Sequence, residues 1–144
     1  MVKVFDKLPA VLVTAVVAGG VAIVGLKMFS SEPADAIISV KVPSLSPTAV
    51  AGKSAFDATC AQCHGTHAAG TDKGPPLVHD IYNPGHHADH AFVLAAQRGV
   101  RQHHWPFGDM PPQAHVSEKD IGNIIRYVRE LQAANGIRYR PHNM

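Results

Sequence analysis

The sequence feature that constrains the fold most is a pair of cysteines followed at once by a histidine, Cys60-Ala61-Gln62-Cys63-His64. A C-x-x-C pair is typical of a redox dithiol, of half a zinc site, or of covalent haem attachment. A thioredoxin-like dithiol needs a surrounding βαβ pattern, which is not visible in this sequence. A four-ligand zinc site needs a second close pair of ligands, and the chain contains no further cysteine. The adjacent histidine favours haem, because two thiols at this spacing reach two vinyl groups of one porphyrin and the next residue can turn its imidazole to the iron.

An uncharged run from Leu8 to Leu26 separates the N-terminus from the rest of the chain. Its residues would rise about 28 Å as a helix, close to the roughly 30 Å thickness of the hydrocarbon core of a bilayer. Lys3 and Lys7 precede the run, so the positive-inside bias favours a cytoplasmic N-terminus. We therefore expect residues 1–29 to form a signal anchor with one transmembrane helix in the inner membrane, and the remaining domain to lie in the periplasm.

Two other interpretations of this segment stay open. Ala34-Asp35-Ala36 has the small-x-small form of a cleavage site, so a signal peptide cleaved near Ala36 would leave a soluble periplasmic protein. The apolar run exceeds the roughly 7–15 residues usual for such a signal, which favours the anchor. A buried helix of a soluble protein is the third interpretation.

Residues 30–48 contain three prolines and five serines, a composition that predicts an extended linker. Within it, residues 38–42 alternate at strand spacing, which would fit a short strand instead. Residues 49–144 then form one domain of about 100 residues, for which burial alone gives only marginal stability unless a cofactor completes the core. The net charge of +2 and the charged fraction of 17% argue against a disordered polyelectrolyte and a nucleic-acid-binding protein.

Helical signals occur in three places and predict an all-α domain. The expected helices cover residues 50–59, 89–98 and 117–135. In the first, Gly52, Phe56 and Cys60 fall four apart on one face, so this helix runs into the cysteine motif. The middle helix is expected to start at Asp89 as its N-cap and to end before Gly99.

The last helix has the strongest pattern. Ser117 is expected to cap it, with Asp120 at the capping-box position, and Gly136 to end it. Its apolar residues recur at helical spacing and form one stripe, namely Ile121, Ile124, Ile125, Val128 and Leu131. Three helices of this kind could surround a flat apolar cofactor.

With these elements in place, the chain resembles class I cytochromes c, which are small electron carriers with a single haem. The resemblance covers roughly residues 49–136. It rests on the cysteine motif, on Gly74-Pro75-Pro76-Leu77, and on Met110-Pro111-Pro112 ahead of the last helix. It implies a bundle of three to four helices around one haem c.

The resemblance also implies roles for individual residues. Cys60 and Cys63 would bind the haem covalently, and His64 would be an axial ligand of the iron. The family's G-P-x-L turn supplies a proline carbonyl to the ring N–H of that histidine, a role that Pro75 would take here. The terminal helices would cross where Gly52, Phe56 and Tyr127 lie.

Met110 is the expected second axial ligand. It lies 46 residues after His64 in a loop that Pro111 and Pro112 stiffen, so its thioether could reach the iron with little ordering cost. The resemblance points to the same residue. Ligation by His103 or His104 is the alternative and would lower the reduction potential.

Ten histidines are more than haem ligation requires. His86, His87 and His90 could form a copper or zinc site, since His90 could lie one helical turn beyond His86, but solvated loop histidines are the simpler interpretation. Of the histidines not yet named, His67, His79, His115 and His142 are isolated.

Four residues near Met110 are candidates for contacts with the cofactor. Trp105 and Phe107 could line a haem pocket, with the Trp105 indole donating to a propionate. Arg98 and Arg101 could pair with propionates or could equally be solvated.

We expect a mono-haem electron carrier, and not an enzyme in itself, that exchanges single electrons with redox protein partners of a respiratory chain and contacts the membrane through its N-terminal helix. No nucleic-acid partner is expected. A fixed cytochrome subunit of a larger respiratory or photosynthetic oxidoreductase would use the same residues. A haem-free metal-handling protein that uses the C-x-x-C pair and the histidines, and a haem sensor or peroxidase with an open distal position, stay open as further alternatives.

Overall fold

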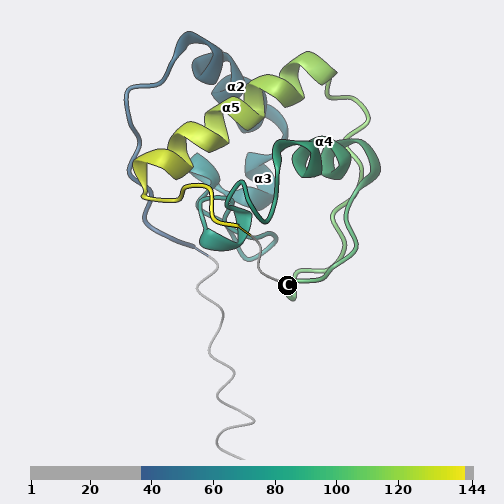
Figure 1. Cartoon of the computed structure of the whole chain (residues 1–144). Helices are drawn as coiled ribbons and strands as arrows, with labels where there is room; N and C mark the ends of the chain where they lie inside the picture. Colours follow the sequence, from purple (N-terminus) through teal and green to yellow (C-terminus); the bar gives the residue numbers. More distant parts are fainter. Residues whose placement is uncertain (1–36, 142–144) are drawn as a thin grey trace, which may run out of the picture. The chain divides into compact units, whose positions relative to one another are not determined.

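The two longest helices of the described residues, α2 (Pro47–Thr59) and α5 (Glu118–Ala134), pack against each other (Figure 1). The computed structural model describes residues 37–141. At the crossing, a Cβ atom on Gly52 would stand 1.9 Å from the carbonyl oxygen of Asn123. Beside this close approach the rings of Phe56 and Tyr127 meet edge to face, with centroids 5.5 Å apart. The predicted crossing of the first and last helices is confirmed.

Shorter helices connect this pair. They are α3 (Ala61–His64), the 3-10 helices η2 (Thr66–Ala68) and η3 (Asp80–Tyr82), and α4 (Asp89–Arg98). Residues 37–141 contain no β-strand, and their single isolated β-bridge joins Val100 and Met110. The all-α prediction is therefore confirmed for this part of the chain.

The predicted transmembrane helix within residues 1–29 lies outside the described residues. Between residues 37 and 141, no helix combines the length and the apolar character needed to cross a membrane.

The helix ends follow local capping chemistry. The Ser117 side chain accepts a hydrogen bond from the Asp120 amide at 3.1 Å, which confirms the predicted cap of α5. Helix α4 covers the predicted residues 89–98, but its N-cap is Ala88, and Asp89 is the first helical residue. The expectation for Asp89 was wrong. A carboxylate in the first turn still interacts favourably with the helix dipole, so the same residue type suits either position.

Helix α2 begins three residues earlier than the pattern predicted, at Pro47 and inside the range expected to be linker. The Ser46 side chain accepts from the Ala49 amide, and proline suits the first helical position because its missing N–H would lack a helical partner there. Because this helix begins with a proline and a polar residue, the spacing of apolar residues does not reveal where it starts.

The segment before α2 is extended and packs on the domain. Ile38, Val40 and Leu45 lie against the core. The Ile38 amide donates to the Ala69 carbonyl at 2.9 Å, and Lys41 exchanges two hydrogen bonds with the Asn135 side chain. The amide and hydroxyl of Ser46 both donate to the Glu130 carboxylate, at 2.9 and 2.7 Å. No strand forms over residues 38–42.

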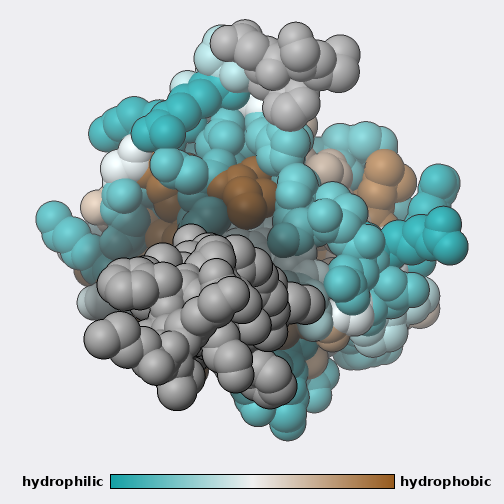
Figure 2. Space-filling view, turned by 90° about the horizontal axis from the view of Figure 1, so that it is seen from below, coloured by the Kyte–Doolittle hydropathy of each residue, from teal (hydrophilic) through white to brown (hydrophobic). Residues whose placement is uncertain are grey.

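The core lies between α2, α5 and the turns that follow the cysteine motif. Tyr127, Val128 and Leu131 of α5 are fully buried, as the apolar stripe predicted for the last two. Gln132 is also buried, and its amide nitrogen donates to the carbonyl oxygens of Leu77 and Tyr82 at 2.8 and 3.1 Å. Mostly hydrophilic residues cover the described surface on the face in Figure 2.

Candidate functional site

His64 ends helix α3 and is buried against the turn that contains Pro75. Its Nδ1 donates to the Pro75 carbonyl oxygen at 2.9 Å, because a carbonyl can only accept. Burial lowers the pKa of His64, and the Pro75 hydrogen bond opposes that effect in part. The neutral imidazole with its proton on Nδ1 has its lone pair on Nε2, the nitrogen available to a metal.

The turn is held against the cysteine motif by its backbone. A Cβ atom on Gly74 would lie 2.9 Å from the Cys63 carbonyl oxygen, so glycine permits the contact. The Thr71 amide donates to the Gly74 carbonyl at 3.0 Å, and the Thr71 hydroxyl donates to the Cys63 carbonyl at 2.5 Å. The Leu77 amide donates to the Ala68 carbonyl at 2.9 Å. These bonds position the carbonyl that orients His64.

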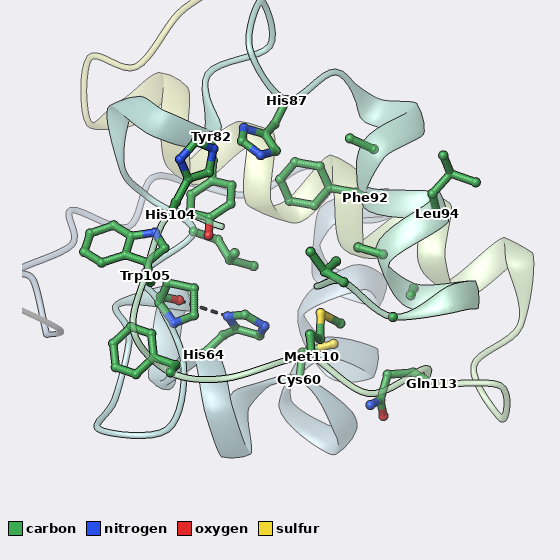
Figure 3. A pocket seen from close by; sticks show the side chains of 18 of the residues that line it. Cys60, His64, Tyr82, His87, Phe92, Leu94, His104, Trp105, Met110 and Gln113 are labelled. Atoms are coloured by element: carbon green, nitrogen blue, oxygen red, sulfur yellow. Dashed lines mark hydrogen bonds between the residues drawn. The ribbon is translucent and has the colours of Figure 1, made fainter. Parts of the chain in front are cut away.

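A cavity of about 440 Å³ opens beside His64. Its volume falls in the range of about 300–1,000 Å³ typical of ligand and cofactor sites. Most of its wall is apolar, and Figure 3 shows His64 with Cys60 and Met110 among the side chains around it. Other wall residues come from α2, η3, α4 and α5, including Phe56, Tyr82, Ala91, Phe92, Leu94, Ala95, Ile121, Ile124 and Ile125.

Met110 lies at the end of a loop that begins after α4. The amides and carbonyls of Val100 and Met110 exchange two hydrogen bonds of 2.9 Å, which close the loop. Gly99 has a φ of +76°, and a Cβ atom there would lie 2.5 Å from the Met110 carbonyl oxygen. The bridge and this glycine thus fix the Met110 backbone at the cavity wall.

The two thiols of the motif differ in their surroundings. Cys60 lines the cavity, whereas Cys63 is half-buried and is not among the lining residues. Burial raises the pKa of the Cys60 thiol to about 11, and the neighbouring Cys63 adds to the increase. Both cysteines are free thiols in the structure.

Aromatic residues form another part of the wall. Trp105 and Phe107 line the cavity as predicted, and the Trp105 ring also meets His79 edge to face at 5.1 Å. Burial raises the pKa of Tyr82 to about 12, while the nearby Trp105 indole opposes this effect. The indole Nε1 is nevertheless buried without a hydrogen bond of good geometry to any described residue.

These observations fit a haem. The apolar wall suits a porphyrin face, the neutral His64 offers a nitrogen ligand, and the unsatisfied Trp105 N–H is a donor for a propionate. Arg101 lines the same cavity and is exposed, whereas Arg98 is exposed and is not among the lining residues.

The histidines are arranged differently from the spacing-based expectation. His103 and His104 line the cavity, and His86 and His87 approach His104, while His90 is exposed at the start of α4. Burial lowers the pKa values of His87 and His104, and the neighbouring histidines lower them further.

Sequence reasoning missed Tyr82 as a wall residue and Gln132 as a buried polar group. Tyr82 lies in a single 3-10 turn without periodicity, and Gln132 has a residue type that is usually exposed. One signal was available for Gln132, since it lies four residues after Val128 and so falls on the same face of α5 as the apolar stripe.

Comparison with known proteins identifies relatives of the chain. Residues 49–132 match the family model described as cytochrome c. The chain is 32% identical over 118 residues to the cbb3-type cytochrome c oxidase subunit CcoP of Rubrivivax gelatinosus, in an alignment that covers 80% of this chain and 33% of that protein. The chain thus spans about a third of the length of this relative. No solved structure gives a significant match.

Proposed function

The chain belongs to the cytochrome c family, and on this premise we propose that it carries single electrons through one covalently bound haem c with His64 and Met110 as axial ligands. Family membership makes it an electron-transfer haem protein. The observation that carries the finer proposal is the pairing, on one cavity, of a histidine oriented by Pro75 and a methionine fixed by the Val100 bridge.

The proposed haem attachment uses Cys60 and Cys63, whose S–H groups would each add across the C=C bond of one haem vinyl group to give a thioether. The Pro75 carbonyl keeps the His64 proton on Nδ1, so the Nε2 lone pair would be available to the iron of a bound haem, and the same hydrogen bond would raise the basicity of the ligand. Haem c, when bound, supplies one-electron cycling between Fe(III) and Fe(II), at a relatively high potential with histidine and methionine ligands. The apolar walls from α4 and α5 offer water few hydrogen-bond partners.

Location and partners are part of the same proposal. Residues 1–29 would anchor the chain in the inner membrane with a cytoplasmic N-terminus, and the haem domain would lie in the periplasm. Cleavage near Ala36 would instead give a soluble periplasmic carrier. Donor and acceptor would be redox proteins that bind through small, weak interfaces, which permit fast release.

A second candidate function is that of a fixed subunit in a larger oxidase complex. The similarity to a subunit of a cytochrome c oxidase favours it. Purification in mild detergent separates the two candidates, because a carrier should elute alone and a fixed subunit should elute with other chains.

The test of the proposed ligation is a redox titration of the haem-loaded protein with absorption spectra, for wild type, Met110→Ala and His104→Ala. We expect Met110→Ala to lower the reduction potential and to remove the methionine-ligand signature from the ferric spectrum, since the thioether favours the ferrous iron. His104→Ala should leave both unchanged. An unchanged spectrum and potential in Met110→Ala would exclude methionine ligation and favour an open or histidine-ligated site.

Covalent attachment is tested separately by mass spectrometry. The intact chain should carry the mass of one haem after acid extraction, and Cys60→Ala with Cys63→Ala should carry none. A wild-type chain without this added mass would contradict the electron-carrier proposal and favour a haem-free metal-handling protein.

A further inference from the structure

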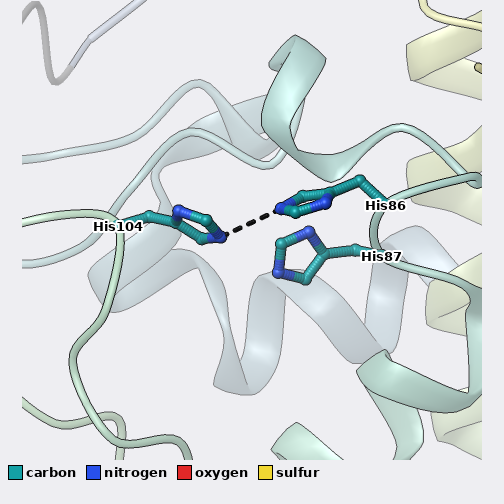
Figure 4. Close-up of side chains that lie close together, drawn as sticks. All are labelled: His86, His87 and His104. Atoms are coloured by element: carbon teal, nitrogen blue, oxygen red, sulfur yellow. Dashed lines mark hydrogen bonds between the residues drawn. The ribbon is translucent and has the colours of Figure 1, made fainter. Parts of the chain in front are cut away.

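Three histidine side chains from two separate segments meet at the edge of the cavity. His86 and His87 belong to the turn before α4, and His104 belongs to the loop between Gly99 and Met110 (Figure 4). One ring nitrogen from each lies within 4.8 Å of the others. The Nε2 atoms of His86 and His104 are 3.2 Å apart.

We propose that His86, His87 and His104 bind a divalent transition metal ion such as Zn²⁺ or Cu²⁺, both of which imidazole ligands suit. Two nitrogen ligands of a tetrahedral zinc ion, each at about 2.0–2.1 Å, lie about 3.3 Å from one another. The observed His86–His104 separation is close to this value. The ring nitrogen of His87 lies within 4.8 Å of the other two, so a bound ion would draw the three rings together.

The short distance between the Nε2 atoms of His86 and His104 indicates which species could bridge them. Two Nε2 atoms at this separation can share a proton or a metal ion. A proton joins only two nitrogens, whereas a metal ion takes three or four ligands. The third imidazole at the same point, from His87, therefore favours a metal ion.

Hydrogen bonds to the backbone orient the rings that surround the site. His87 Nδ1 donates to the Ile81 carbonyl at 2.8 Å, which leaves the lone pair on Nε2. His103, next to His104, likewise bonds the Arg101 carbonyl through Nδ1 at 2.8 Å, and its ring centroid lies 4.4 Å from that of His104. A carbonyl on the second ring nitrogen is the usual arrangement for a metal-ligating histidine. His103 flanks the cluster but is not one of the three residues whose ring nitrogens meet.

The position of the cluster permits metal entry. His104 is exposed, and His86 and His87 are half-buried. The proposed haem ligands His64 and Met110 are not members of the cluster, which adjoins the haem cavity through His87 and His104.

The test is calorimetric titration of ZnCl₂ into the haem-loaded, full-length protein, which must carry no histidine tag and be stripped with a chelator first. We expect saturable binding of one Zn²⁺ per chain. His104→Ala and His86→Ala should each weaken it by at least about 100-fold, the upper end of the loss seen when only an outer-shell partner of a ligand is removed. His90→Ala and His115→Ala, which replace exposed histidines outside the cluster, should bind zinc as the wild type does.

Two results would overturn the proposal. The first is zinc binding by the wild type that is no tighter than binding by a His86→Ala/His104→Ala double variant. The second is a His104→Ala variant with unchanged zinc affinity but an altered haem spectrum, which would assign His104 to the haem site. Cu²⁺ in place of zinc gives an independent readout, because its paramagnetic resonance should show nitrogen ligation that the double variant lacks. Thermal unfolding in zinc-free buffer confirms that the variants are folded.

Discussion

The two sides of the cavity differ in how the chain holds them. His64 is buried, bonded to Pro75, and backed by the packed pair of helices α2 and α5, whereas Met110 closes a loop in which most of residues 101–109 are exposed. On the His64 side, many contacts hold the ligand side chain in one position. On the second side the position of Met110 depends on the bridge to Val100 and on the close fit of Gly99. We infer that substitutions on the helix side alter stability, and that substitutions in the loop alter ligation of the iron.

The largest expected loss of stability is for a substitution on the helix side, at Gly52. In Gly52→Ala the new Cβ atom would meet the Asn123 carbonyl at 1.9 Å, so α2 and α5 would have to separate. We expect a loss of about 3 kcal/mol or more, since the obstacle is backbone and cannot rotate away. The corresponding fall in Tm is about 10 °C or more for a domain of this size, measurable by thermal unfolding of the haem-loaded protein.

A matched control is Gly122→Ala in α5. A Cβ atom at Gly122 would have no neighbour within 4 Å, and alanine favours a helix by up to about 1 kcal/mol over glycine. This variant should therefore be as stable as the wild type or more stable. Equal Tm values for the two variants would show that the helix crossing does not require glycine.

An intermediate loss of stability, together with a lower reduction potential, is expected for a substitution in the loop, at Gly99. Gly99→Ala places a side chain at positive φ, which costs about 1–2 kcal/mol, and also drives a Cβ atom toward the Met110 carbonyl. We expect the Val100–Met110 bridge to open, with faster amide hydrogen exchange at both residues and a lower reduction potential. Gly108→Ala isolates the steric part, because its φ of +85° is similar but no atom lies within 4 Å of its Cβ position. If the two variants had the same potential, the contact with Met110 would not be what holds the loop.

The smallest expected change is in the stability at acidic pH, and it concerns Glu130 on the helix side. Burial alone would raise the pKa of Glu130, but hydrogen bonds from Ser46 and the ion pair with Arg126 outweigh burial and hold the pKa below its usual range. The carboxylate thus stabilises the fold above its unfolded-state pKa of about 4.3, and this contribution is lost as the pH falls through the lower folded-state value.

Glu130→Gln should lower stability at neutral pH by no more than about 1 kcal/mol and should flatten the stability profile between neutral and acidic pH. Thermal unfolding as a function of pH measures this change. Glu118→Gln, at the exposed start of the same helix, controls for the loss of one negative charge. An acid profile unchanged in Glu130→Gln would contradict the assignment.

The sequence predicted the parts of the fold that local spacing encodes. The Ile121–Leu131 stripe and the Ser117 cap define α5. Both involve residues that are close in sequence or belong to one repeating pattern, so they can be read without knowledge of the tertiary structure. The bond between His64 and Pro75 was expected only from the resemblance of Gly74–Leu77 to a turn of the cytochrome c family.

The features that the sequence did not predict depend on contacts between segments that are far apart along the chain. His104 meets His86 because the loop after α4 folds back over the turn before it, and spacing along the chain had pointed to His90 instead. The buried Gln132 amide donates to the Leu77 carbonyl and shares the Tyr82 carbonyl with Arg129, and neither carbonyl can be located from sequence. Local patterns therefore predicted the helices, and only the assembled loops gave the histidine cluster.

The extended segment ahead of α2, residues 37–46, limits how far the domain could lie from an N-terminal anchor. Because residues 37–46 are bonded to Ala69, Asn135 and Glu130, they cannot serve as spacer. If residues 1–29 anchor the chain as proposed, the spacer shortens from residues 30–48 to residues 30–36, and its greatest extension falls from about 65 Å to about 25 Å. Such a carrier would sample a shell close to the bilayer surface, where the local concentration of membrane-embedded partners is high and that of diffusing partners is not.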